Sequence, residues 1–219
     1  MAGCTSMTAD TSNPRRRWRV VAFAVGTVAL VLLLATVAVR EPARAPAPVG
    51  FESIDITGAP YGRDFRLLDP DGKPRQLSDF RGRVVLVFFG FTQCPDVCPT
   101  ALARAVEVMK QLGSDAQRVQ VIFVTVDPER DTPALLREYM RAFDPSFLGL
   151  YADPTTTAQT AREFKVYYAK VPTPSGYTID HSAITYAFDA AGRLRLAIKH
   201  EQSVQSVSAD VKRLLAVPR

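Results

Sequence analysis

A continuously apolar run lies shortly before a pair of cysteines, and this junction constrains the fold more than any other stretch. Residues 84–91 are Val-Val-Leu-Val-Phe-Phe-Gly-Phe, without the polar alternation of a strand that has one face in water. Such a run predicts a central strand that is covered on both faces. Residues 94–99 are Cys-Pro-Asp-Val-Cys-Pro, and residues 99–112 carry apolar side chains at helical spacing. The cysteine pair is therefore expected between a buried strand and a helix.

The rest of the chain from residue 51 onward alternates between strand and helix patterns. We expect strands at 119–126 and 148–151, hairpins at 64–77 and 183–199, and helices at 132–143, 155–164 and 203–215. Thr132 and Pro133 are typical of a helix start, as N-cap and first helical residue. This order predicts an α/β domain with a central mixed sheet and helices on both faces. The cysteine pair at the first strand-to-helix junction, with a closing hairpin and helix, indicates a thioredoxin-like fold.

An uncharged stretch of twenty residues, 20–39, precedes this domain. At 1.5 Å per residue, a helix of that length crosses a hydrocarbon core of about 30 Å. Four arginines between residues 15 and 19 favour a cytoplasmic tail at 1–19 and place residues 51–219 outside the cytoplasm. We therefore expect a transmembrane signal-anchor at 20–39. A cleaved signal peptide, cut near residues 35–38, is the alternative, although the apolar region of such peptides is usually only about 7–15 residues long.

The positive charge of the chain is concentrated around this apolar stretch. The formal net charge is +5, and five of the 27 Lys and Arg residues flank the stretch, which leaves 22 against 21 Asp and Glu from residue 41 onward. Residues 40–50 carry three prolines among alanines and are expected to form a semi-extended tether. No basic stripe with interleaved aromatic residues is present, so we expect no nucleic-acid partner.

The spacing of the cysteines indicates a metal or redox site. Three cysteines are too few for a disulfide framework, and Cys4 lies apart in the polar tail as an incidental thiol. Pro99 fits the first turn of a helix, which would place Cys98 at or near the N-cap and Cys94 in the preceding loop. The helix dipole would then favour both thiolates. Three residues separate the two cysteines, which leaves room for two soft ligands around Cu(I) or for a disulfide.

A third ligand would have to come from one of the two histidines. His181 follows Asp180 in a polar loop before a predicted strand, and in a thioredoxin-like sheet such a loop can approach the cysteine junction. Asp180 could then orient the imidazole. A lone histidine is as often a surface or core residue, and we expect His200 at a solvent-exposed strand end.

Two further stretches could support such a site. Residues 127–133 leave the second buried strand at its carboxyl end, where α/β sheets place their sites. Most of this stretch is expected to be a capped turn, and whether Asp127 supports the site is left open. Phe88, Phe89 and Phe91 precede the cysteines and are expected to be core and pocket wall.

Residues 88–100, 126–133 and 180–182 together resemble the signature of the Sco/SenC family: FFGFTQCPDVCPT, VDPERDTP and DHS. The resemblance covers about residues 51–215. It implies a thioredoxin-fold protein anchored in the inner membrane and facing the periplasm or cell exterior. It further implies that Cys94, Cys98 and His181 bind copper, as Cu(I) or Cu(II). The implied role is to build the dinuclear copper site of cytochrome c oxidase subunit II, by delivering copper, reducing cysteines or both. Other copper chaperones are further candidate partners.

Two alternatives use the same cysteines without copper. A periplasmic thiol–disulfide oxidoreductase would use Cys94 as the attacking thiolate and Cys98 as the resolving one. A peroxidase related to the peroxiredoxins would need Thr92 and an arginine around a single cysteine, which the double-cysteine loop fits poorly. The choice between metal transfer and thiol reduction stays open at this point.

Overall fold

The computed structural model of this protein describes residues 50–217. The predictions for the cytoplasmic tail, the membrane anchor and nearly all of the tether lie outside these residues, and so does Cys4. Within residues 50–217, no helix combines the length and the apolar character needed to cross a membrane.

Within residues 50–217, six strands form the central sheet, in the order β1-β10-β9-β4-β5-β6. Its middle consists of β4 (Val84–Gly90) and β5 (Val119–Thr125), which run parallel and are buried along their whole length. On one side β6 (Leu148–Leu150) continues the parallel pairing. On the other side the pairing is antiparallel, through β9 (Ile184–Phe188), β10 (Leu194–Lys199) and β1 (Ile54–Asp55). The predicted buried central strand and mixed sheet are confirmed.

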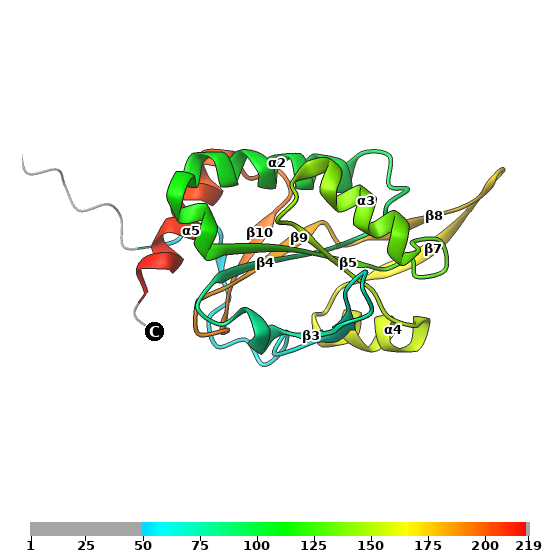
Figure 1. Ribbon diagram of the computed structural model, residues 1–219, viewed down its shortest axis with the longest axis horizontal. Helices are drawn as coiled ribbons and strands as arrows, with labels where there is room; N and C mark the ends of the chain where they lie inside the picture. Colours follow the sequence, from blue (N-terminus) through cyan, green and yellow to red (C-terminus); the bar gives the residue numbers. More distant parts are fainter. Residues whose placement is uncertain (1–49, 218–219) are drawn as a thin grey trace, which may run out of the picture. The chain divides into compact units, whose positions relative to one another are not determined.

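Helices cover both faces of this sheet (Figure 1). One face carries α2 (Val97–Leu112), α3 (Pro133–Phe143) and α5 (Val204–Ala216), and the other carries α4 (Pro154–Glu163). The start of α3 is as predicted: the Thr132 side chain accepts a hydrogen bond from the Leu135 N–H, and Pro133 is the first helical residue. The arrangement is the predicted thioredoxin-like α/β fold.

Two short ribbons complete the domain. The predicted first hairpin consists of β2 (Arg66–Leu68) and β3 (Pro74–Gln76), followed by the short 3₁₀ helix η1 (Leu77–Phe80). A second 3₁₀ helix, η2 (Gly113–Arg118), follows α2. Neither 3₁₀ helix, nor β1, was predicted.

The second ribbon, β7 (Tyr168–Thr173) paired with β8 (Gly176–His181), is the main difference from the prediction. It extends away from the central sheet (Figure 1). His181 was expected in a loop, but it is the last residue of β8 and pairs with Tyr168. Sequence patterns missed the ribbon because much of it is exposed, so it lacks alternation, and because Pro172 argues against a strand.

Candidate metal centre

The cysteine loop connects β4 to α2, as expected, but the helix begins earlier than predicted. Asp96 is the N-cap, so Cys98 is the second residue of α2 and Pro99 the third. Cys98 thus lies near the N-cap, as expected, and Pro99 lies in the first turn. Proline is tolerated there because the N–H groups of the first turn have no partner within the helix. Cys94 lies in the preceding loop, where its N–H donates to the Phe91 carbonyl over 3.2 Å.

The fold brings the three predicted ligands together. The sulfurs of Cys94 and Cys98 and a ring nitrogen of His181 all lie within 4.8 Å of one another. Cys98 Sγ is 3.4 Å from His181 Nε2, and the Cys98 N–H donates to Cys94 Sγ over 3.4 Å. Both thiols are free; Cys98 is fully buried, whereas Cys94 and His181 are half-buried. The group therefore has one buried side and one side open to solvent.

The backbone sets the orientation of the His181 ring. Its Nδ1 lies 3.1 Å from the Ser182 carbonyl, which can only accept a hydrogen bond. We therefore assign the proton to Nδ1, which leaves the lone pair of Nε2 directed toward Cys98. Burial lowers the pKa of His181, which favours the neutral form that binds metals. Asp180, the predicted orienting residue, is exposed, and the Ser182 carbonyl takes that role.

Aromatic side chains form the wall of this group, as predicted. The rings of Phe88 and Phe91 meet the His181 ring edge-on, with centroids 6.0 and 5.8 Å away. Phe89, the neighbour of Phe88 in the strand, packs instead against Phe164 in the core, with centroids 5.1 Å apart. His200, expected to be exposed, is half-buried, and it is not a member of the three-residue group.

The electrostatics of Cys98 differ from the prediction. The helix start was expected to favour the thiolate at both cysteines. Burial instead raises the pKa of Cys98, and the nearby Cys94 raises it further. Ionising a fully buried sulfur costs more free energy, because the thiolate is not hydrated, than its interaction with the helix dipole supplies. In the metal-free protein Cys98 is therefore a protonated thiol, and a bound cation would have to replace that proton.

Gly90 leaves the space that the Cys98 sulfur occupies. A Cβ atom at this position would lie 2.6 Å from Cys98 Sγ and 2.9 Å from a ring carbon of Phe123. The strand therefore has to end in glycine for the sulfur to sit against it. Sequence reasoning missed this residue, although an isolated glycine inside a strand pattern is a signal of close approach.

Comparison with known proteins agrees with this geometry. Residues 55–216 match the SCO1/SenC family. The chain belongs to this family. A SCO2-like protein of Rickettsia felis is 34% identical over 177 residues, which are 80% of this chain and 84% of that protein. The copper-bound structure of Bradyrhizobium japonicum ScoI is 42% identical with a TM-score of 0.64, and the match covers 69% of this chain and 98% of that one. Apo Sco1 of Thermus thermophilus is 43% identical with a TM-score of 0.68, covering 76% and 98%.

In this Sco-family chain, residues 127–133 do more than form a capped turn. Asp131 is buried and accepts three hydrogen bonds: from the Thr92 N–H (3.0 Å), the Thr92 hydroxyl (2.6 Å) and the Thr125 hydroxyl (2.6 Å). Burial raises the pKa of Asp131, and these hydrogen bonds oppose the shift. Since Thr92 lies two residues before Cys94, Asp131 fixes the start of the cysteine loop to the end of β5.

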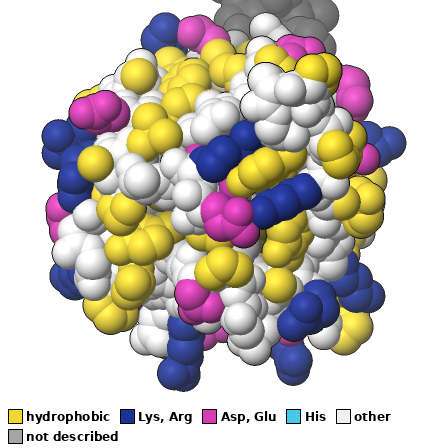
Figure 2. Space-filling view, turned by 90° about the vertical axis from the view of Figure 1, so that its right-hand side faces the viewer, with side chains coloured by type: hydrophobic (Ala, Val, Ile, Leu, Met, Phe, Trp, Pro, Cys, Tyr) yellow, Lys and Arg dark blue, Asp and Glu magenta, His cyan; other side chains and the backbone are white. Residues whose placement is uncertain are grey.

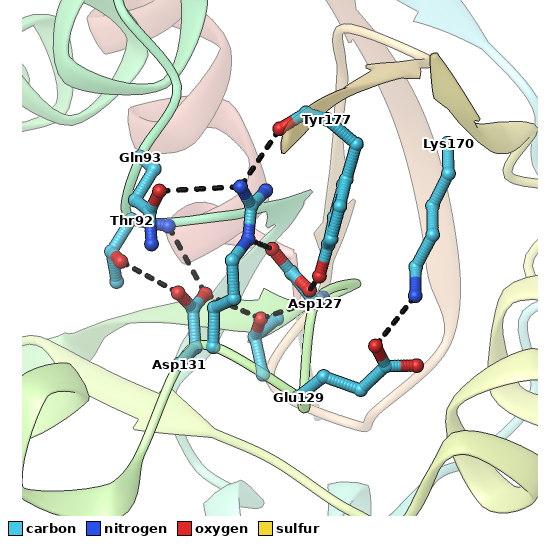
Figure 3. A network of polar contacts seen from close by, with 9 residues as sticks. Thr92, Gln93, Asp127, Glu129, Asp131, Lys170 and Tyr177 are labelled. Carbon is cyan, nitrogen blue, oxygen red and sulfur yellow. Dashed lines mark hydrogen bonds and ion pairs between the residues drawn. The ribbon is translucent and has the colours of Figure 1, made fainter. Parts of the chain in front are cut away.

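A second set of contacts joins the same stretch to β8 (Figure 3). Asp127, whose side chain is fully buried, pairs with Arg130 and accepts a hydrogen bond from the Tyr177 hydroxyl over 2.8 Å. Arg130 also contacts Gln93, the residue before Cys94. Sequence reasoning singled out neither Arg130 nor Tyr177, because the side-chain contacts between β8 and this stretch are not visible in the local pattern.

The donor set of this Sco-family chain fits copper. Two sulfurs and one imidazole nitrogen are soft to borderline ligands, which suit copper better than calcium or magnesium. Phe88 and Phe91 restrict access from the protein side, and the half-exposed Cys94 and His181 leave an approach from solvent. The same two free thiols are also close enough together for disulfide chemistry.

Proposed function

We propose that this chain is a copper-binding assembly factor that delivers copper to, or reduces the cysteines of, the dinuclear copper site of cytochrome c oxidase subunit II. The observation that carries the proposal is the convergence of Cys94, Cys98 and His181 within 4.8 Å. Membership of the SCO1/SenC family supports the choice of metal and target.

In this proposal each ligand has a distinct place. Cys98 binds the metal from the buried side, and His181 presents Nε2 because Nδ1 is held by the Ser182 carbonyl. Cys94 is half-exposed, so a partner thiolate can approach from its side and take over ligands one at a time. Two thiolates favour Cu(I), and the imidazole also accommodates Cu(II).

A copper titration tests this proposal. We expect the reduced full-length protein to bind one copper ion, and Cys94→Ser, Cys98→Ser and His181→Ala each to weaken binding strongly. His200→Ala serves as the matched control, since His200 is half-buried like His181 but lies outside the three-residue group. Unchanged stoichiometry and affinity in all three ligand variants would refute the assignment.

A second candidate function, thiol–disulfide exchange, is favoured by the unequal exposure of the two free thiols. The Cys94 thiolate would attack a partner disulfide, forming a mixed disulfide and releasing one partner thiolate. Cys98 would then give up its proton, for which His181 Nε2 at 3.4 Å is placed as acceptor, and attack Cys94 Sγ. This closes the Cys94–Cys98 disulfide and releases the second partner thiol.

Trapping experiments test the exchange reaction. In Cys98→Ser the mixed disulfide at Cys94 has no internal thiol to resolve it, so it should accumulate with a disulfide-containing peptide of the target. Cys94→Ser should give no adduct, because Cys98 is fully buried. Adducts in equal amounts from both variants would exclude the assigned roles.

We further propose that residues 20–39 anchor the chain in the inner membrane, with residues 51–219 in the periplasm or outside the cell. The arginines before the apolar stretch support this orientation. Alkaline phosphatase fused after residue 219 should be active, because that enzyme needs an oxidising compartment. An inactive fusion would reverse the orientation, and the mass of the mature chain would reveal cleavage near residues 35–38.

A further inference from the structure

We propose that Arg130 is a positioning residue that holds the ribbon β7–β8 against the cysteine loop and so places His181 for the metal. The inference rests on the proposed copper function and adds to it a residue that is not itself a ligand. It concerns how the third ligand is kept next to the two sulfurs, which are on a different part of the chain.

The Arg130 guanidinium bridges the two parts of the site, and its partners Gln93, Asp127 and Tyr177 are labelled in Figure 3. Its Nη1 donates to Gln93 Oε1 over 3.2 Å, next to Cys94, and to the Tyr177 carbonyl over 2.8 Å, in the strand that ends at His181. The guanidinium carbon also lies 3.8 Å from the centre of the Tyr177 ring. One rigid, planar group therefore contacts both the cysteine loop and β8.

A buried carboxylate holds this guanidinium in place. The Asp127 side chain has no exposed surface and pairs with Arg130 Nε, while its other oxygen accepts from the Tyr177 hydroxyl over 2.8 Å. Asp127 thus binds both members of the stacked pair. Because the carboxylate is buried, the ionic contact is weakly screened and keeps a defined geometry.

The ribbon needs such a contact because it is not part of the central sheet. Within the described residues β7 and β8 pair only with each other, and an isolated two-stranded ribbon is of marginal stability. At its base, Tyr167 and Ser182 exchange hydrogen bonds, and Ile179 packs into the core. Neither of these contacts reaches the cysteine loop, whereas Arg130 does.

Lys170 provides a matched control on the opposite face of the same ring. Its Nζ lies 4.6 Å from the centre of the Tyr177 ring and pairs with Glu129 over 2.6 Å. Figure 2, which views the molecule from the end where β7–β8 lies, shows basic and hydrophobic side chains side by side near the middle of this face. Both members of the Lys170–Glu129 pair are about half-exposed, and such pairs contribute little to stability.

The test compares Arg130→Gln with Lys170→Gln in the full-length protein. Cu(I) affinity is measured by competition with a chromophoric chelator, and hydrogen exchange of the 176–181 amides is measured without metal. We expect Arg130→Gln to weaken Cu(I) binding by about 10–100-fold, the usual effect of removing a group that supports a ligand. It should also speed exchange in β8, and Lys170→Gln should do neither. Arg130→Lys should give a Cu(I) affinity and an exchange rate between those of the wild type and Arg130→Gln, because it keeps the charge but loses the planar guanidinium.

The same substitution in a His181→Ala background separates positioning from general destabilisation. If Arg130 acts through His181, its removal has no further effect on the residual affinity of the two cysteines. An equal loss in both backgrounds, or wild-type affinity in a folded Arg130→Gln protein, would overturn the proposal.

Should Arg130→Gln fail to fold, Tyr177→Leu removes the stacked ring while keeping the Arg130–Asp127 pair, and the same two outcomes apply. If the wild-type protein binds no copper, the proposed function fails, and the exchange rates alone decide whether Arg130 holds the ribbon.

Discussion

Replacing Gly90 by alanine should damage the metal site much more than its effect on stability would suggest. The added Cβ would lie 2.6 Å from Cys98 Sγ, 2.9 Å from a ring carbon of Phe123 and 3.1 Å from one of Phe88. These neighbours are all buried, so none can move freely into solvent. Reaching an ordinary contact of 3.4 Å from 2.6 Å requires a relative shift of about 0.8 Å.

The size of this shift determines whether stability or Cu(I) affinity falls more. Overpacking in a core typically costs about 1–3 kcal/mol, which for a domain of this size lowers Tm by roughly 2–12 °C. Metal–ligand distances tolerate only about 0.2 Å, so a sulfur displaced by several times that amount no longer fits the ligand set. We expect Gly90→Ala to remain folded at 25 °C and to lose most of its Cu(I) affinity, as measured by chelator competition and thermal unfolding.

Gly149→Ala supplies the control, because it creates a similar clash away from the site. Its Cβ would lie 2.4 Å from Leu136 Cγ, between β6 and α3. It should destabilise the fold by a similar amount and leave copper affinity unchanged. Wild-type copper affinity in Gly90→Ala, or an equal loss of affinity in Gly149→Ala, would show that the space at Gly90 does not set the position of the Cys98 sulfur.

Three further predictions concern the stability of the fold. Burial alone would raise the pKa of Asp189, but hydrogen bonds from Arg193 and Arg195 lower this pKa below 3.8. The ionised Asp189 therefore stabilises the fold above about pH 4. This stabilisation is lost as the pH falls through the lowered pKa. Asp189→Asn should lower the free energy of unfolding by about 1–3 kcal/mol at pH 7. When urea unfolding is measured at a series of pH values, the variant should also lose less stability in acid than the wild type does. The buried Tyr139 hydroxyl has no hydrogen-bond partner among the described residues, so Tyr139→Phe should raise Tm by about 2–4 °C in calorimetry. Cu(I) at about 100 times its Kd should stabilise the wild type by about 2.7 kcal/mol, reversibly with a chelator, and should have almost no effect on Cys98→Ser.

The central fold could be predicted because its signals are local and strong. Residues 84–90 and 119–125 are buried throughout, so their sequences are mostly apolar, and the start of α3 carries its cap residue and proline together. The start of α2 lies two residues before the run 99–112 that predicted this helix, because proline is tolerated within the first turn and not only at its first position.

The support for the site could not be predicted because it depends on contacts between distant segments. Asp127 and Arg130 are three residues apart, yet their common partner Tyr177 belongs to a ribbon whose exposed strands leave no alternating pattern. The Ser182 carbonyl that orients His181 is a backbone atom, which residue identity cannot reveal. The helix dipole argument failed at Cys98 because the sequence does not show how deeply a side chain is buried.

The two proposed uses of the cysteine pair make different demands on the rest of the site. A Cys94–Cys98 disulfide would take both sulfurs out of the ligand set, so oxidation and copper binding exclude each other. A molecule that has reduced a partner must therefore itself be reduced before it can bind copper again. Copper binding needs Nε2 of His181 at a fixed position among the ligands, whereas exchange needs from His181 only a proton acceptor near the buried Cys98 thiol. Exchange therefore tolerates a looser placement of His181 than copper binding does. A buried Asp127, a bridging Arg130 and a stacked Tyr177, all directed at the His181 ribbon, are better explained by copper binding.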